Sequence, residues 1–363
     1  MISSYALRLT CLSLACFFLL NLIVGLGVAA AARPILRIAG RRSAREATRM
    51  LLWIRLLPSA FAISVVAILC VPSYLYLEPH FDAEPVGAVC AIAAIFGAAV
   101  LCAAVARTIA AIERSSRMLR GWKRSARPLQ IAGAKCLRVP RCFNPRAKPL
   151  ARARGSATTS EPRPQGSGYA NFRNLVLVSS GPPLIALAGL FRQRVLVSSE
   201  ILETLPADEL ELAISHERAH AASADNWKRL LLALAPDAAP FLRLYGNLER
   251  GWVKFTEWAA DEAAAQGDPR RSLSLASALV RVARLSAGPE LPSAISPLVA
   301  DRAGLAARVE RLLRPSAAPP RAAKPRSSAL LLTALASTAL AAFTLSQTAT
   351  LVSVHEILEQ LIR

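Results

Sequence analysis

The chain has 363 residues, of which 54% are hydrophobic and only 19% are charged. Soluble domains average about 45–50% apolar and about 25% charged residues, so this composition favours an integral membrane protein and excludes a disordered chain. A net charge of +20 is typical of a nucleic-acid-binding protein, unless the basic residues lie in the segments between membrane spans and reflect their topology. The seven cysteines show no zinc-knuckle spacing and are interpreted as small hydrophobic residues in a reducing compartment.

Four stretches are long and apolar enough to form transmembrane helices, which need about 20 residues each. They cover residues 9–32, 56–77, 86–106 and 328–354. We therefore predict an α-helical membrane protein with four transmembrane helices and one soluble α+β domain. The predicted division is a three-span region at 1–113, a basic Pro/Ser/Gly-rich linker at 114–170, the soluble domain at 171–314, a Pro-rich linker at 315–327, the fourth span at 328–354 and a short tail at 355–363.

The charged residues between the spans predict their orientation. Six arginines and one glutamate occupy 33–50, three acidic and no basic residues occupy 78–85, and fourteen basic residues against Glu161 occupy 114–163. By the positive-inside rule, the N-terminus lies outside and the soluble domain is cytoplasmic in a multi-pass inner or cell membrane protein. The two basic segments hold 18 of the 20 net charges, so we expect no nucleic-acid partner. Residues 114–170 are instead expected to lie on anionic lipid headgroups.

The soluble domain begins with β-strand patterns and continues with helical ones. Residues 174–179, 184–190 and 195–198 are rich in β-branched and aliphatic residues and predict a meander or a set of hairpins. From Pro206 the pattern is helical, and further helices are expected at 226–235, 248–266, 271–286 and 301–313.

A metal-binding motif lies in the first of these helices, which contains His216-Glu217-Arg218-Ala219-His220. Positions i and i+4 of a helix share one face, so His216 and His220 can bind one Zn²⁺. Glu217 is then placed to act as general base without binding the metal. The alternative is a surface helix with two solvated histidines, but the chain has only four histidines and two of them occur at this spacing.

A third ligand is available on the helix predicted at 248–266. Glu257 can bind the metal, and Asp261, one turn later, could accept the free ring N–H of a ligand histidine. Neighbouring alanines make this helix narrow enough to pack closely on the histidine helix. The sequence therefore predicts one zinc ion per chain, held by His216, His220 and Glu257.

The H-E-x-x-H motif followed by a Glu257-x-x-x-Asp261 helix resembles the gluzincin membrane peptidases. The likeness covers about 175–313 and extends to two families: the BlaR/MecR-type antirepressor peptidases, and the HtpX-type quality-control proteases with the related prenyl-protein proteases. Three spans, a zinc domain and a last span resemble the BlaR/MecR layout. Only a short tail follows Val354, so β-lactam sensing is not implied.

The expected function is a membrane-integral zinc metalloendopeptidase that hydrolyses a cytoplasmic or juxtamembrane protein or peptide. The role could be antirepressor-like signalling or membrane protein quality control. The substrate is expected to add as a strand to an exposed sheet edge near 184–198. The residue that stabilises the oxyanion stays open, with Tyr245 and Arg308 as weak candidates. The alternative is a non-catalytic scaffold or pseudopeptidase with a structural zinc site.

Overall fold

The computed structural model describes residues 2–78, 86–123, 126–128, 175–178, 183–239, 244–285, 295–297, 302–314 and 347–362. Three of its helices are long and apolar enough to cross a membrane, over Tyr5–Ala30, Ala44–Leu77 and Ala88–Gly121. They overlap the first three predicted spans, at 9–32, 56–77 and 86–106. The fourth predicted span, 328–354, lies outside the described residues except at its end, where α13 (Thr348–Ile362) begins.

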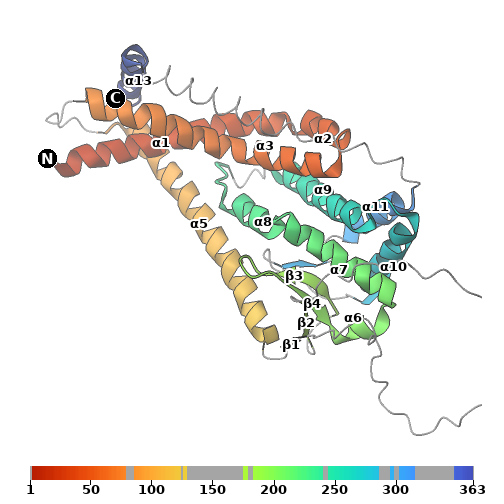
Figure 1. Ribbon diagram of the computed structural model, residues 1–363. Helices are drawn as coiled ribbons and strands as arrows, with labels where there is room; N and C mark the ends of the chain where they lie inside the picture. Colours follow the sequence, from red (N-terminus) through yellow and green to blue (C-terminus); the bar gives the residue numbers. More distant parts are fainter. Residues whose placement is uncertain are drawn as a thin grey trace, which may run out of the picture.

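The first two membrane helices form one layer of the molecule, and the third runs from this layer toward the rest of the chain (Figure 1). α1 (Ile2–Ala30) lies beside a continuous helix that comprises α3 (Ala44–Val65), the π-helical turn η1 (Val66–Cys70) and α4 (Val71–Leu77). The short α2 (Ala32–Gly40) connects α1 to this helix. α3 begins ahead of the predicted span because Ser43 and Glu46 form a capping box, each side chain accepting a backbone N–H at 3.3 Å.

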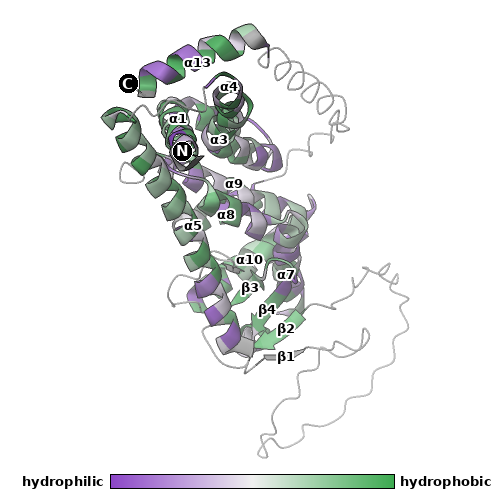
Figure 2. Ribbon diagram, turned by 90° about the vertical axis from the view of Figure 1, so that its left-hand side faces the viewer, coloured by the Kyte–Doolittle hydropathy of each residue, from purple (hydrophilic) through white to green (hydrophobic). Residues whose placement is uncertain are grey.

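α5 (Ala88–Lys123) continues well beyond the predicted third span, which ends at residue 106. It therefore includes the first part of the segment predicted as a linker, and the three-residue strand β1 (Ala126–Pro128) follows it. Figure 2 shows α5 as apolar along the membrane layer and polar at the end that reaches the sheet. The linker prediction for 114–170 is thus wrong at its beginning, and residues 129–174 lie outside the described part of the chain.

The sheet of the soluble domain has five described strands in the order β1-β2-β4-β3-β5. Beyond β1, the strands are β2 (Leu175–Val178), β3 (Ile185–Ala188), β4 (Arg194–Ser198) and β5 (Ile295–Pro297). β3 and β4 form the expected hairpin, but β2 pairs in parallel with β4, so the sheet is not a meander. A parallel pair cannot be joined by a tight turn, and here β3 forms part of the connection.

Apart from the short helix at Ser199–Thr204, which was not predicted, the helices of the soluble domain agree closely with the predicted ranges. They are α6 (Ser199–Thr204), α7 (Ala207–Ala222), α8 (Asp225–Leu234), α9 (Gly246–Ala265), α10 (Pro269–Leu285) and α11 (Arg302–Leu313). One apolar core joins the inner face of the sheet to α7 and α10, through residues such as Ile185, Leu187 and Leu279. α7 also packs on α9, where Ala260 and Ala264 are buried, so the narrow helix predicted from the alanines is confirmed.

The soluble domain sits directly against the membrane layer, with α9 beneath α3 and α8 beside α5 (Figure 1). Arg55 of α3 is buried at this junction and donates from Nε to Glu249 Oε1 at 2.9 Å. Its guanidinium also lies 4.0 Å from the centre of the Tyr245 ring. The junction therefore fixes one end of α9 to a membrane helix.

Candidate metal centre

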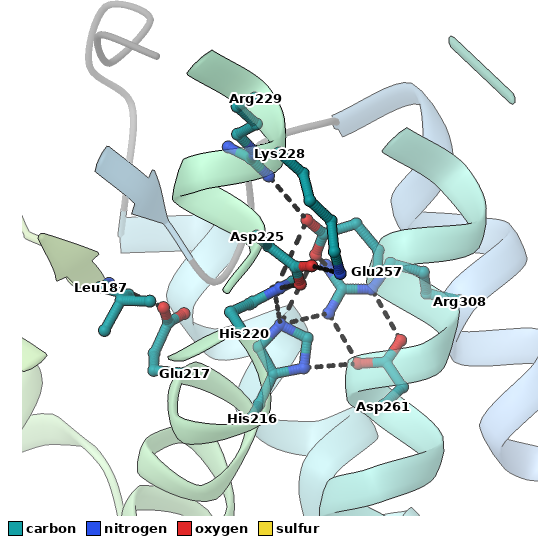
Figure 3. A network of polar contacts seen from close by, with 10 residues as sticks. All are labelled: Leu187, His216, Glu217, His220, Asp225, Lys228, Arg229, Glu257, Asp261 and Arg308. Carbon is teal, nitrogen blue, oxygen red and sulfur yellow. Dashed lines mark hydrogen bonds and ion pairs between the residues drawn. The ribbon is translucent and has the colours of Figure 1, made fainter. Parts of the chain in front are cut away.

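The two motif histidines face one carboxylate inside the domain (Figure 3). His216 and His220 lie one turn apart on α7, and their Nε2 atoms are 3.1 Å apart. Glu257 of α9 places Oε2 3.5 Å from His216 Nε2 and Oε1 3.7 Å from His220 Nε2. All three side chains are buried. His216, His220 and Glu257, the ligand triad, thus come together as predicted from the spacing.

Each ligand histidine is held by a second carboxylate on its other ring nitrogen. His216 Nδ1 lies 2.9 Å from Asp261 Oδ1, and His220 Nδ1 lies 2.8 Å from Asp225 Oδ2. Burial alone would raise the pKa of Asp261, but the Arg308 guanidinium outweighs it and lowers this pKa. The pKa of Asp225 is likewise raised by burial, yet lowered overall by hydrogen bonds from His220 and Lys228. Both carboxylates are therefore ionised acceptors, so Nδ1 carries the proton and Nε2 is free to bind a metal.

Arg308 of α11 clamps the α9 side of the centre. Its Nε and NH2 donate to the two oxygens of Asp261 at 2.8 and 2.7 Å, and its NH1 lies 3.0 Å from Glu257 Oε2. Burial raises the pKa of Glu257, but the charge of Arg308 lowers it well below its usual value. The sequence offered Arg308 as an oxyanion candidate; the structure instead places it as the residue that keeps Glu257 and Asp261 ionised and oriented.

The donor set fits a zinc ion. Ligand atoms of a tetrahedral zinc site lie about 3.4 Å apart, and the three distances within the triad scatter around that value. In the neutral tautomer with Nδ1 protonated, two imidazole lone pairs and a carboxylate would point at one another, which is favourable only around a cation. Although burial opposes protonation, the charge of Glu257 and the hydrogen bond to Asp225 raise the pKa of His220 to about 10. The same negative surroundings would favour a divalent metal.

Glu217 lies beside the triad but points toward the sheet (Figure 3). Its Oε2 accepts the backbone N–H of Leu187 on β3 at 2.7 Å, and its Oε1 is buried without a hydrogen-bond partner among the described residues. Burial raises the pKa of Glu217 to about 7, against the opposing charges of His216 and His220. A carboxylate with a pKa near neutrality suits the predicted general base.

The Leu187 contact also shows which edge of β3 faces the base. Ser198 donates its N–H to Leu184 O at 2.9 Å, so Leu184 bonds toward β4. Successive residues of a strand direct their backbone groups to opposite sides, so the N–H of Leu187 points away from β4. Glu217 therefore lies along the β3 edge on which β5 pairs, with Ser296 opposite Leu187.

Tyr245, the other oxyanion candidate, is not brought to the triad. It precedes α9, and Glu257 follows twelve residues later, about 18 Å along the helix axis. There it is buried against Arg55 at the membrane junction.

Sequence reasoning missed two site residues on α8, Asp225 and Arg229. α7 ends without glycine, and Ala224 adopts φ 55°, a left-handed conformation that a residue with a Cβ rarely takes. That turn directs Asp225 back onto His220, whereas the sequence shows only an Asp five residues after a histidine.

Residues 165–282 match the family model of peptidase family M48. The M48 match spans β2 to β4, the whole of α7, α8 and α9, and most of α10. It supports a zinc-dependent metallopeptidase, in agreement with the triad. No curated protein and no solved structure matches this chain.

Proposed function

We propose that this chain is a membrane-embedded zinc metalloendopeptidase that cleaves a cytoplasmic or juxtamembrane protein. The carrying observation is the convergence of His216, His220 and Glu257, each supported by a further buried charged side chain. The donor set is typical of catalytic zinc: structural sites are usually closed by four ligands and rich in cysteine, whereas this one offers three and a neighbouring Glu217.

The chain's own residues divide the chemistry among them. When bound, Zn²⁺ supplies a Lewis acid that polarises the scissile carbonyl and makes water more acidic. Glu217 accepts one proton from the attacking water as the new C–O bond forms. It then returns this proton to the amide nitrogen as the C–N bond breaks, so that it ends the cycle ionised. Asp225 and Asp261 keep the two imidazoles in the tautomer that leaves Nε2 unprotonated.

The predicted position of the substrate needs a correction. The expected exposed edge near 184–198 is absent among the described strands, because β3 pairs with β4 on one side and with β5 on the other. The base nevertheless lies along the β5 side of β3. An extended substrate that pairs there would first have to displace β5, which is only three residues long.

The proposed orientation rests on the charges of the connecting segments, with the zinc domain in the cytoplasm and the basic segment 114–170 near anionic lipid. Reporter fusions at Gly166 and Ala83 test it. We expect a cytoplasmic signal at Gly166 and an extracytoplasmic one at Ala83. The reverse pattern would move the substrate to the other side of the membrane. Signalling and quality control remain two roles open to the same chemistry.

The decisive experiment compares purified full-length wild type with Glu217→Gln in detergent. Wild type should contain about one zinc per chain and hydrolyse a casein-derived fluorogenic peptide library. The variant should keep its zinc and lose about 10²–10⁴-fold in rate, because the base is removed while the ligands are untouched. Glu211→Gln, an exposed Glu on the same helix, is the matched control and should behave as wild type. Zinc without hydrolysis in the wild type would instead favour the scaffold with a structural metal site.

A further inference from the structure

Arg229 of α8 is a half-buried cation at the metal centre, with a side chain that is 14% exposed and N–H donors that are only partly used. Its NH2 lies 3.6 Å from Glu257 Oε1, too far for a hydrogen bond. Nε and NH2 are both buried and have no hydrogen-bond partner among the described residues. Buried N–H groups usually have hydrogen-bond partners, so the two buried nitrogens of Arg229 need a reason.

The position of Arg229 follows from the face of α8 that meets the triad. Asp225 and Arg229 are four residues apart and therefore share one face of the helix. Asp225 holds His220 from this face, while Arg229 reaches the same Glu257 oxygen that faces His220 (Figure 3).

The other arginine at the centre has a different arrangement. Arg308 makes two short hydrogen bonds to Asp261 and an ion pair to Glu257, so its donors are committed to holding the ligand side of α9. Arg229 makes no such bidentate contact with any described residue. Arg308 is therefore placed to orient Glu257 and Asp261, whereas Arg229 has N–H groups available to hydrogen-bond a further group.

The charge balance of the centre indicates what Arg229 would receive. The centre contains four carboxylates and three cationic side chains: Glu217, Asp225, Glu257, Asp261, Lys228, Arg229 and Arg308. If both histidines are neutral, adding a divalent ion leaves the centre with one net positive charge. Without Arg229 the same count would be neutral. The surplus charge suits one added anion.

We propose that Arg229 stabilises the oxyanion of peptide hydrolysis, a role that rests on the proposed function above. When water adds to the scissile carbonyl, its oxygen takes the electron pair of the C=O bond and becomes negative while Glu217 holds the proton. The unpaired N–H groups of Arg229 donate to that oxygen. The oxygen's electron pair then re-forms the C=O bond as the C–N bond breaks, and the nitrogen takes the proton from Glu217. A planar guanidinium with two buried nitrogens is well suited to this role.

The test uses full-length zinc-loaded protein carrying Arg229→Gln or Arg229→Lys, with Arg250→Gln as the control. Arg250 is an exposed arginine on α9, bonded only to Asn247 among the described residues. Two probes are used: a fluorogenic peptide cleaved by wild type, and a phosphinic analogue of that peptide, whose tetrahedral anionic group mimics the transition state. Zinc affinity is measured separately by chelator competition.

We expect Arg229→Gln to lower kcat by about 10²–10³-fold, as loss of one oxyanion donor does, with KM nearly unchanged. Affinity for the phosphinic analogue should fall in parallel with kcat/KM, and Arg229→Lys should lose less. Zinc affinity should stay equal or rise, because a cation beside Glu257 has been removed. Arg250→Gln should match wild type.

Two outcomes would overturn the proposal while leaving the peptidase intact. Zinc affinity that falls together with activity would make Arg229 a support for Glu257. A kcat/KM within about threefold of wild type, with unchanged binding of the phosphinic analogue, would show that the oxyanion is stabilised elsewhere. If wild type neither binds zinc nor cleaves peptides, the proposed function and this inference fail together, and the Glu217→Gln comparison identifies that case.

Discussion

The membrane layer exposes large apolar side chains, whereas the zinc domain buries charged ones. On the three apolar helices, large residues such as Ile23, Trp53 and Ile95 are 66%, 70% and 68% exposed. In the domain, the motif residues His216, Glu217 and His220 are 0% exposed. The exposed apolar side chains of the first region suit a lipid environment, whereas burial in the second region strengthens the electrostatic interactions between charges.

The difference shows what each region requires of its interior. A helix in lipid needs only close packing and satisfied backbone groups, so alanines and a few polar side chains suffice. A buried ionised group needs a partner of opposite charge. In the centre, Asp225 pairs with Lys228 and Asp261 pairs with Arg308. Arg55 belongs to both regions, since it lies on a membrane helix and pairs with Glu249 of the domain.

The largest expected effect comes from removing a ligand. In His216→Ala, His220→Ala or Glu257→Ala, zinc content and hydrolysis should both fall to background, because two ligands cannot retain the metal and the buried charges lose their cation. Glu211→Ala removes an exposed carboxylate from the same helix as the two histidines and should change neither. Full zinc occupancy in Glu257→Ala, measured by mass spectrometry of the metal, would show that another residue is the third ligand.

Removing a supporting carboxylate should have a smaller effect. Asp225→Asn or Asp261→Ala should weaken zinc binding about 10–100-fold, since each imidazole loses the acceptor that fixes its tautomer. Chelator competition gives the affinity. Asp268→Asn is the control, because Asp268 interacts with the backbone N–H of Arg270 outside the centre. Equal affinities in all four proteins would remove the supporting role from both carboxylates.

The pH dependence should show the base. Glu217 acts only when deprotonated, so kcat/KM should fall about tenfold per pH unit below its pKa and level off above it. Burial raises this pKa to about 7, and bound Zn²⁺ would lower it, so the midpoint should lie at or below about 7. Zinc content is measured at each pH. A fall that follows zinc release instead would assign the titration to the ligands.

The smallest effect is expected at the junction between the two regions. Arg55→Met removes the ion pair to Glu249 and the contact with Tyr245, and should lower the free energy of unfolding by about 1–3 kcal/mol. Thermal unfolding and hydrogen exchange at the start of α9 measure this. Arg49→Met, an exposed arginine on the same helix, is the control. No change in either measurement would mean that apolar packing alone joins domain and membrane layer.

Much of the fold could be predicted because its signals are local. Apolar runs of helical length predict the first three spans, and the helices of the domain follow from periodicity and from residues such as Pro206. Strand pairing could not be predicted in the same way. The apolar patterns of β2, β3 and β4 do not by themselves specify a neighbour. In the structure β2 pairs in parallel with β4, and Leu175 of β2 joins the core formed with α7 and α10. The extension of α5 was missed because its last turns are basic.

By itself, the sequence determined the part of the centre that depends on spacing within one helix. His216, Glu217 and His220 on α7, and Glu257 with Asp261 on α9, follow from the periodicity of 3.6 residues, which places positions four apart on one face. Only the tertiary structure decided how these helices meet and what surrounds them. A left-handed Ala224 brings Asp225 to His220, α11 brings Arg308 from 47 residues beyond Asp261, and α8 leaves Arg229 beside Glu257. Such contacts depend on the packing of several helices at once, and no local pattern encodes them.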